Sequence, residues 1–491
     1  MKVLFLNPPF HYKFSRAQRS PAVTKGGTIY YPIWLAYATG VVEQAGYEVK
    51  LIDAPPQGKT IYDILNETKS FNPDIIIIDT STPSILNDVK VGEKLKDALG
   101  AFVVLVGTHV SALPEETLKL SKKIDAIAVG EYDYTILELV ETLQHSGDLS
   151  KILGISYQLN GKIYHNPKRP FIENLDELPF VSKVYKKHLN VRDYFYTICK
   201  YPEVTIITGR GCPYRCHYCV YPQVMFGHKY RKRSVENIVQ EFEYIVNELP
   251  EVKEIFIEDD TFTIDKERVR NFSKLLLERG IKISWTANAR FDVDYETLKI
   301  MHEAGCRMLC VGFESGDNRI LRVMGKGLRQ ERAFQFVKDA QRAGILVHGC
   351  FMAGNPGETK KTLEKTLEFA IKLNPDTAQF FPIMVYPGTR AYEWANKHGY
   401  LTTNDFSQWV TKEGLHNCVV STPYLSNREL VEWCDYARRK FYLRPQYIAY
   451  RTKRLILHPE DSKRILKSFK TFVRYLFRGT KYKSFGYCSC V

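Results

Sequence analysis

Three cysteines, Cys212, Cys216 and Cys219, stand within eight residues of the chain. They directly follow the apolar run from Val204 to Thr208, which is typical of a buried strand. Thiolates bind soft metal centres, and full ligation of an iron-sulfur cube by protein takes four of them. Three thiolates on one loop therefore predict a cube with one iron left open. An open coordination position is typical of a catalytic metal site.

A zinc site is the alternative interpretation of this loop. Zinc needs four ligands, and His217 or the pair Cys306 and Cys310 would have to complete the set. Free cysteine is more often a small buried hydrophobe, so we expect Cys306 and Cys310 to lie in or beside a core strand.

The spacing Cys-x-x-x-Cys-x-x-Cys, with aromatic Tyr218 before the last cysteine, resembles the cluster motif of the radical S-adenosylmethionine (radical SAM) enzymes. The resemblance implies that Cys212, Cys216 and Cys219 hold a 4Fe-4S cluster whose open iron binds S-adenosylmethionine. It further implies reductive cleavage to a deoxyadenosyl radical, with an electron donor such as flavodoxin or ferredoxin.

Residues 196–400 alternate apolar runs with helical patterns, as in a partial (β/α)6 TIM-type barrel, where active groups follow the strands. The acidic turn at Glu258, Asp259 and Asp260 can accept hydrogen bonds from an amine, although a helix cap or a solvated turn is the alternative for any one of the three. A carboxylate beside a serine suits ribose hydroxyls. The cofactor contacts implied by the resemblance are Tyr218, Glu258, Asp259, Asp260, Arg290, Glu314, Ser315, Lys326, Gly354, Asn355 and Pro356.

Residues 1–145 predict an α/β unit with a doubly wound parallel sheet, because five short apolar runs alternate with helical patterns. Ligands of such Rossmann-like sheets lie beyond the carboxyl ends of the strands. No G-x-G-x-x-G follows the first run, which argues against a dinucleotide.

This stretch resembles the cobalamin-binding domain that precedes the barrel in one branch of the radical SAM enzymes. The strand-end residues that the resemblance makes candidates for cobalamin contact are Asn7, Pro8, Thr80, Ser81, Gly107, His109, Gly130 and Glu131. The chain lacks D-x-H-x-x-G, whose histidine ligates cobalt in many such domains. We therefore expect cobalamin without a histidine lower ligand, and His109 and His11 as surface or hydrogen-bonding residues.

Two further regions complete the predicted organisation. Residues 146–195 predict a linker and strap that contains a hairpin around Asn160 and Gly161. Residues 401–491 predict a mainly helical basic region. From Arg438 onward, fifteen Lys or Arg residues stand against Glu460 and Asp461, so +13 of the total net charge of +14 lies there.

The clearest helical pattern of this region runs from Asp461 to Arg478, with apolar residues on one side and basic residues around much of the rest. Such a helix suits a membrane interface, and packing on the barrel or on a second subunit is the equal alternative. Nucleic acid fits the charge but lacks a recognised module. No signal peptide or membrane span is evident, so we expect a cytoplasmic protein, which the basic helix would allow to bind peripherally to the membrane.

Together these features predict a cobalamin-dependent radical SAM enzyme, most simply a methyltransferase acting on an unactivated carbon of a small-molecule or lipid-like substrate. The first rival is a radical SAM cyclase, oxidase or C-C bond-forming enzyme without methyl transfer. The second is a zinc-containing nucleic-acid-binding protein.

Overall fold

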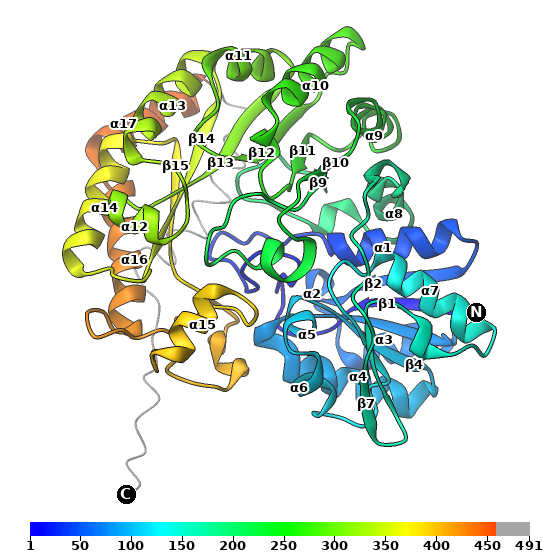
Figure 1. Ribbon diagram of the computed structural model, residues 1–491. Helices are drawn as coiled ribbons and strands as arrows, with labels where there is room; N and C mark the ends of the chain where they lie inside the picture. Colours follow the sequence, from blue (N-terminus) through cyan, green and yellow to red (C-terminus); the bar gives the residue numbers. More distant parts are fainter. Residues whose placement is uncertain (458–491) are drawn as a thin grey trace, which may run out of the picture.

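The computed structural model describes residues 1–457 and is built on two α/β units with mainly parallel sheets (Figure 1). The first sheet has seven strands in the order β2-β1-β3-β4-β5-β6-β7. Its strands are β1 (Lys2–Asn7), β2 (Glu48–Asp53), β3 (Ile75–Thr80), β4 (Phe102–Gly107), β5 (Ala126–Ala128), β6 (Ile155–Leu159) and β7 (Lys162–His165).

Helices cover both faces of this first sheet. Phe5 and Ile77 pack into the core that contains α1 (Ile33–Gln44) and α7 (Asp133–Gln144). Their neighbours Leu6 and Ile78 pack into the core that contains α3 (Ile61–Lys69) and α4 (Ile85–Leu99). This alternation follows from the two-residue period of a strand, and it confirms the predicted doubly wound unit. The helices of this part are α1 (Ile33–Gln44), α2 (Ala54–Gln57), α3 (Ile61–Lys69), α4 (Ile85–Leu99), α5 (Thr108–Ala112), α6 (Pro114–Leu118), α7 (Asp133–Gln144) and α8 (Val181–His188).

The predicted hairpin exists, and it extends the first sheet. β6 and β7 pair antiparallel through Asn160 and Gly161, both at positive φ, and β6 pairs antiparallel with β5. Part of the expected linker is therefore an edge of the first unit, because its strand hydrogen bonds are satisfied there.

The second sheet has six parallel strands in the order β15-β14-β13-β12-β11-β8. Among the described residues β8 and β15 do not pair, so the sheet is an open part of a barrel, as predicted. Its strands are β8 (Glu203–Ile206), β11 (Glu254–Ile257), β12 (Ser284–Ala289), β13 (Cys306–Glu314), β14 (Leu346–Ala353) and β15 (Thr377–Pro382), with β9 (Gly209–Arg210) and β10 (Arg231–Lys232) forming a separate short pair. Its helices are α9 (Val235–Glu248), α10 (Lys266–Glu278), α11 (Tyr295–Glu303), α12 (Asn318–Val323), α13 (Gln330–Ala343), α14 (Lys360–Leu373) and α15 (Arg390–Lys397).

The region after α15 is only partly helical. Residues 398–426 are mainly loops, with a short 3-10 turn at Phe406–Trp409. α16 (Asn427–Tyr442) then packs on β15, where the Tyr442 hydroxyl contacts the backbone of Ala378, and α17 (Pro445–Leu457) follows. The predicted helix between Asp461 and Arg478 lies outside the described residues. In the part of the chain that the structure describes, no helix is long and apolar enough to span a membrane.

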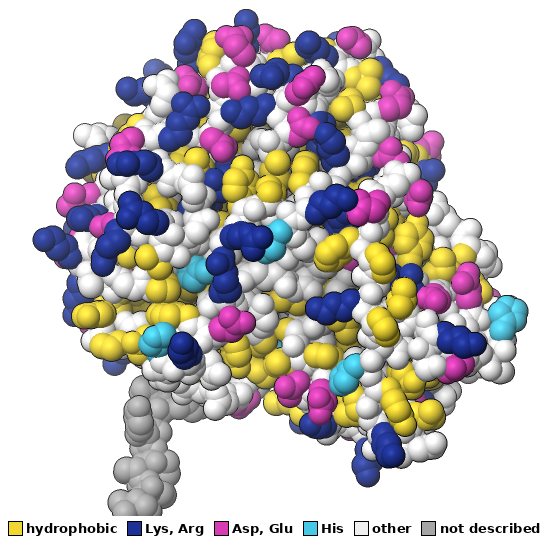
Figure 2. All heavy atoms as spheres, viewed as in Figure 1, with side chains coloured by type: hydrophobic (Ala, Val, Ile, Leu, Met, Phe, Trp, Pro, Cys, Tyr) yellow, Lys and Arg dark blue, Asp and Glu magenta, His cyan; other side chains and the backbone are white. Residues whose placement is uncertain are grey.

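The loops at the carboxyl ends of the two sheets contact each other. Ser111, which follows β4, lies 3.6 Å from the sulfur of Met225, which follows the cysteine loop. Gly388, after β15, lies against Ala112. The carboxyl edges of both sheets, where ligands of such folds bind, therefore meet at one place. Figure 2 shows basic and acidic side chains interspersed over this side of the molecule, in keeping with the small net charge outside the tail.

Candidate active site between the two sheets

The cysteine loop starts directly beyond β8 and β9. Gly211 has φ +82°, and a Cβ there would lie 2.3 Å from the carbonyl oxygen of Lys229, so only glycine fits this entry. The Cys212 amide donates to the Gly227 carbonyl at 3.3 Å. The Gln223 amide nitrogen donates to the Cys219 carbonyl at 2.7 Å. These bonds hold the loop in place without using any sulfur atom.

The three loop sulfurs suit a cluster better than a single zinc ion. A single metal ion needs ligand atoms that lie close together. Among the described residues, one group of three Cys, His, Asp or Glu side chains has its ligand atoms within 4.8 Å of one another, and this group does not include Cys212, Cys216 or Cys219. A tetrahedral zinc ion with bonds of about 2.3 Å would bring its sulfurs to about 3.8 Å. A cube binds each thiolate on a different iron, so it accepts wider spacing. Burial raises the pKa of Cys212 to about 11, so metal binding must release its proton.

The three acidic residues of the turn after β11 have two different roles. Asp259 accepts hydrogen bonds from the Thr208 amide at 2.5 Å, the Thr208 hydroxyl at 2.6 Å and the Gly209 amide at 3.1 Å, so its carboxylate fixes the start of the cysteine loop. Glu258 and Asp260 instead face Arg19, which comes from the loop between β1 and α1. Burial raises the pKa of Glu258, and the guanidinium opposes that rise.

Arg19 is a functional candidate that the sequence analysis did not find. Its guanidinium donates to Glu258 and lies 3.4 Å from the Asp260 carboxylate, and it also lies 5.6 Å from the Tyr221 ring. The basic residues in its segment were visible in the sequence, but nothing in their spacing indicated a partner 239 residues away.

Glu314 gathers several of the predicted contacts at the end of β13. Its Oε1 accepts from the Tyr218 hydroxyl at 3.0 Å and from the Lys326 ammonium at 3.1 Å. Its Oε2 is buried and has no hydrogen-bond partner among the described residues. A buried acceptor without a partner costs free energy, so it marks a place where a ligand donor would fit. Arg290 lies beside Glu314 and Lys326, and its guanidinium donates to the Lys326 carbonyl at 2.7 Å.

Ser315 lies beside Glu314 but belongs to the packing of the barrel. It is fully buried, and its hydroxyl lies 3.3 Å from the Thr366 hydroxyl on α14 and accepts from the Asp317 amide at 3.2 Å. These bonds occupy the hydroxyl, so the structure does not bring it to the Glu314 carboxylate that was expected to share a ligand with it.

The turn after β14 contains the last predicted barrel contacts. Glu358 Oε2 accepts from the amides of Gly354 at 2.5 Å and Asn355 at 2.8 Å, which shapes the turn around Pro356. The side-chain oxygen of Asn355 is buried without a partner among the described residues. It is therefore a second acceptor available to a ligand.

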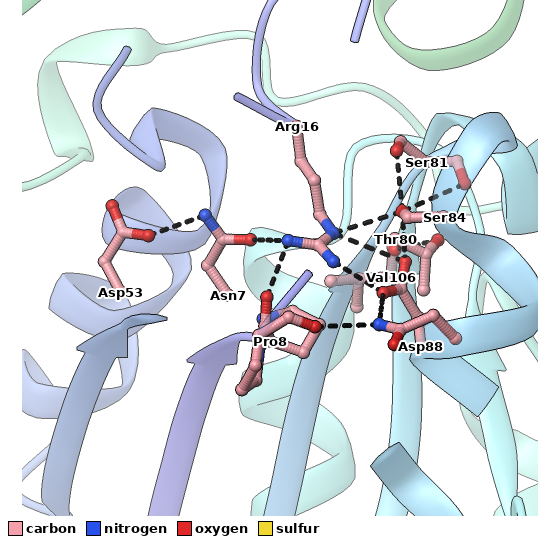
Figure 3. Close-up of polar contacts among 11 residues, drawn as sticks. Asn7, Pro8, Arg16, Asp53, Thr80, Ser81, Ser84, Asp88 and Val106 are labelled. Carbon is pink, nitrogen blue, oxygen red and sulfur yellow. Dashed lines mark hydrogen bonds and ion pairs between the residues drawn. The ribbon is translucent and has the colours of Figure 1, made fainter. Parts of the chain in front are cut away.

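Several predicted residues of the first sheet form a closed polar network (Figure 3). Asn7 donates to Asp53 at 2.7 Å and accepts from Arg16 at 2.7 Å, and Arg16 also donates to the Pro8 carbonyl and forms a fully buried ion pair with Asp88 at 2.6 Å. The Thr80 hydroxyl donates to the Val106 carbonyl, and the Ser81 hydroxyl lies 2.8 Å from that of Ser84. The polar groups of Asn7, Thr80 and Ser81 already have partners, so they shape the edge of the sheet.

Gly107 and His109 lie at the same edge. Gly107 has φ +112°, and a Cβ would lie 2.5 Å from the Thr80 carbonyl, so close backbone packing explains this glycine. His109 is buried, contacts the Thr82 hydroxyl at 3.2 Å and packs against the Phe406 ring. Burial lowers the pKa of His109 to about 3, which makes it a neutral hydrogen-bonding histidine.

A buried ion cluster joins the end of the first sheet to the cysteine loop. Arg210, directly before Gly211, contacts Asp133 at 2.6 and 3.1 Å and Glu131 at 2.8 Å. Arg231 contacts the other oxygen of Glu131 at 2.7 Å. Glu131 is thus bound by two guanidinium groups and positions the loop. Gly130 precedes it at φ +74°, near the Met225 carbonyl.

The geometry fits the cofactors that the resemblance implied. Three free thiols on one loop, the carboxylates of Glu258 and Asp260, and two buried acceptors that lack a partner among the described residues suit a cluster with an adenosyl amino acid ligand. At the edge of the first sheet, Tyr132 has a buried hydroxyl without a partner among the described residues, and Asp79 is buried nearby. Such groups fit a ligand with many amide side chains, as cobalamin has.

Comparison with known proteins agrees with this geometry. The model of the radical SAM superfamily matches residues 206–370, and that of the B12 binding domain matches residues 19–140. A protein from Pyrococcus horikoshii described as an uncharacterized methyltransferase is 35% identical over 451 residues, which cover 91% of this chain and 94% of that protein. The chain belongs to the cobalamin-binding radical SAM enzymes.

Two further proteins show how widely this architecture is used. An anaerobic magnesium-protoporphyrin IX monomethyl ester cyclase from Rubrivivax gelatinosus is 28% identical over 399 residues, covering 79% of this chain and 68% of that protein. The structure of the radical S-adenosylmethionine methyltransferase TsrM from Kitasatospora setae matches 82% of this chain and 77% of its own with a TM-score of 0.65 at 18% identity, which shows a shared fold.

Proposed function

We propose that this enzyme transfers a methyl group to an unactivated carbon of a small-molecule substrate. The observation that carries the proposal is the contact of Arg19, from the cobalamin-type unit, with Glu258 and Asp260 at the mouth of the barrel. This contact supports the proposal because it joins the carboxyl edges of the two sheets, where a methyl donor on one side would reach a substrate activated on the other. The description of the Pyrococcus relative as a methyltransferase supports the same conclusion.

The residues of this chain have distinct tasks in the proposed reaction. Cys212, Cys216 and Cys219 hold the cluster. When bound, the cluster supplies the electron that cleaves S-adenosylmethionine, and cobalamin supplies the methyl group.

Four other side chains orient the S-adenosylmethionine. Arg19 contacts one oxygen of Glu258 and one of Asp260, and the two carboxylates accept hydrogen bonds from the ammonium group of S-adenosylmethionine on the lone pairs that Arg19 leaves open. The free Oε2 of Glu314 accepts from a ribose hydroxyl, and the free oxygen of Asn355 accepts from the adenine amine. Tyr218 and Lys326 keep the Glu314 carboxylate in place.

The products of turnover test methyl transfer. Reconstituted enzyme is incubated anaerobically with reductant, cobalamin, S-adenosylmethionine and candidate substrates. A methylase uses one S-adenosylmethionine to restore the methyl donor and another for cleavage. S-adenosylhomocysteine, deoxyadenosine and methylated substrate should therefore accumulate together. Turnover that is undiminished without cobalamin would contradict the proposal.

A radical cyclization is the second candidate, because a cyclase is among the relatives that match most of this chain. A cyclase would form deoxyadenosine without S-adenosylhomocysteine. The same product analysis therefore separates the two reactions.

Two partners follow from the sequence and extend this proposal. Flavodoxin or ferredoxin would supply the electron, and residues 459–491 would bring the enzyme to a membrane that holds a lipid-like substrate. Removing residues 459–491 should weaken binding to anionic liposomes, because each basic residue near such a surface contributes about 1 kcal/mol. Full-length protein that ignores liposomes at every ionic strength would contradict the membrane contact.

A further inference from the structure

Two cysteines and a histidine meet on neighbouring strands of the barrel sheet, away from the cysteine loop. Cys310 lies on β13, and His348 and Cys350 lie on β14. Cys310 is the register partner of His348, and Cys350 is the partner of Gly312. One ligand atom from each of the three residues lies within 4.8 Å of the other two. Among the described residues, this is the group of side chains whose ligand atoms lie close enough together to share one metal ion.

We propose that Cys310, His348 and Cys350 bind a zinc-class divalent metal ion. The two sulfurs are 3.9 Å apart. Tetrahedral zinc with bonds of about 2.3 Å separates its sulfurs by about 3.8 Å, so the thiols already have the spacing of a shared ion. Two soft thiolates and one imidazole are a ligand set that zinc accepts.

The surroundings support a metal with an open position. Cys310 and Cys350 are half-buried, although they lie on central strands of the sheet. His348 Nδ1 lies 2.7 Å from the Thr377 hydroxyl, a contact of the kind that orients metal-binding imidazoles. Three protein ligands leave a fourth position for water or for a donor atom of a substrate, as in catalytic zinc sites.

The site lies near the place proposed for S-adenosylmethionine. Cys310 and Gly312 alternate along β13 and share one face of the sheet. A β-bulge follows Gly312, and the Glu314 carboxylate still lies over that face, because a Cβ at Gly312 would be 2.1 Å from Glu314 Oε1. Cys350 is the register partner of Gly312, and Glu314 pairs with the next residue of β14, Phe351. The face also contains the partly aromatic group of Ile198, Phe256 and Met308, against which Cys310, Tyr30 and Tyr196 pack. A metal here would contact a substrate that enters the barrel from its carboxyl edge.

The test uses the full-length chain with Cys212, Cys216 and Cys219 replaced by alanine, so that the cluster loop contributes no thiolate. Anaerobic protein is loaded with Zn²⁺ alone and, separately, with Co²⁺ alone, and then dialysed. We expect about one Zn²⁺ per chain by elemental analysis. We also expect thiolate-to-cobalt charge-transfer bands in the Co²⁺ protein. A chain that retains no zinc and shows no such bands overturns the proposal, and so does a Cys310–Cys350 disulfide found by mass spectrometry in the anaerobic protein.

Matched variants locate the ion. In the same background, Cys310→Ser with Cys350→Ser should abolish zinc retention, whereas Cys306→Ser with Cys418→Ser should not, because these two buried thiols lie outside the group. Thr377→Val should weaken zinc affinity about tenfold by removing the contact to His348. Equal zinc content in the two double variants would overturn the assignment. In the otherwise wild-type chain, the iron of the cluster should be unaffected by any of these changes.

Discussion

The guanidinium of Arg210 and the carboxylate of Asp133 form a buried two-point contact, with N–O distances of 2.6 and 3.1 Å, that ties the cobalamin-type unit to the first residue before the cluster loop. Paired bonds of this kind fix orientation as well as distance. The position of the three cysteines relative to the first sheet thus depends on a residue that no cysteine motif contains.

Replacing Asp133 by asparagine should lower the free energy of unfolding by about 3–5 kcal/mol, because it leaves the buried Arg210 with fewer countercharges. Thermal unfolding measures this loss, and iron content after reconstitution measures the loosening of the loop. Glu173→Gln is the control, since it breaks only an exposed pair with Lys229. Equal melting temperatures for the two variants would show that the buried pair does not hold the units together.

Each of Cys212→Ala, Cys216→Ala and Cys219→Ala should abolish cluster assembly, because a cube cannot be held by two thiolates. Iron and sulfide analysis should find about four irons in the wild type and almost none in the variants. Cys306→Ala and Cys310→Ala should keep the cluster. If Cys306→Ala or Cys310→Ala lost its iron while a loop variant retained it, the cluster would be bound by other residues.

Gly312→Ala should weaken S-adenosylmethionine binding about tenfold, which corresponds to about 1.4 kcal/mol. A Cβ at this position would lie 2.1 Å from Glu314 Oε1 and 2.8 Å from the Lys326 nitrogen. Both atoms end flexible side chains, so we expect them to shift while the strand stays folded. Calorimetric titration of the reconstituted protein measures the affinity. An unchanged affinity would show that Glu314 does not contact the ligand.

Glu358→Gln should reduce the change of the free energy of unfolding with pH between pH 4.5 and about pH 7. Burial raises the pKa of Glu358 from 4.5 to about 7. The folded state therefore holds this proton more tightly than the unfolded state. The resulting stability is fully present below pH 4.5 and is lost as the pH rises through about 7.

Melting temperatures of wild type and variant, compared across that interval, test this expectation. The difference in melting temperature between wild type and variant should change between pH 4.5 and about pH 7, and it should stay constant above pH 7. A difference that is the same at every pH would show that Glu358 does not titrate there.

Much of the architecture followed from the sequence alone, because it depends on local patterns. The apolar runs at Val3 and at Ile75 become β1 and β3, and the run before Cys212 becomes β8, since strand period and length are encoded in neighbouring residues. Cys212, Cys216 and Cys219 are predicted as cluster ligands for the same reason, because that role is inferred from their spacing along one loop.

The tertiary structure decided everything that depends on residues far apart in the chain. It alone paired Arg19 with Glu258 and Arg210 with Asp133, directed Asp259 and Ser315 into the packing, and brought Cys310 beside His348 and Cys350. Burial and long-range contacts set these roles, because a carboxylate or thiol has the same letter in the sequence whether it faces a ligand, a backbone amide or another side chain.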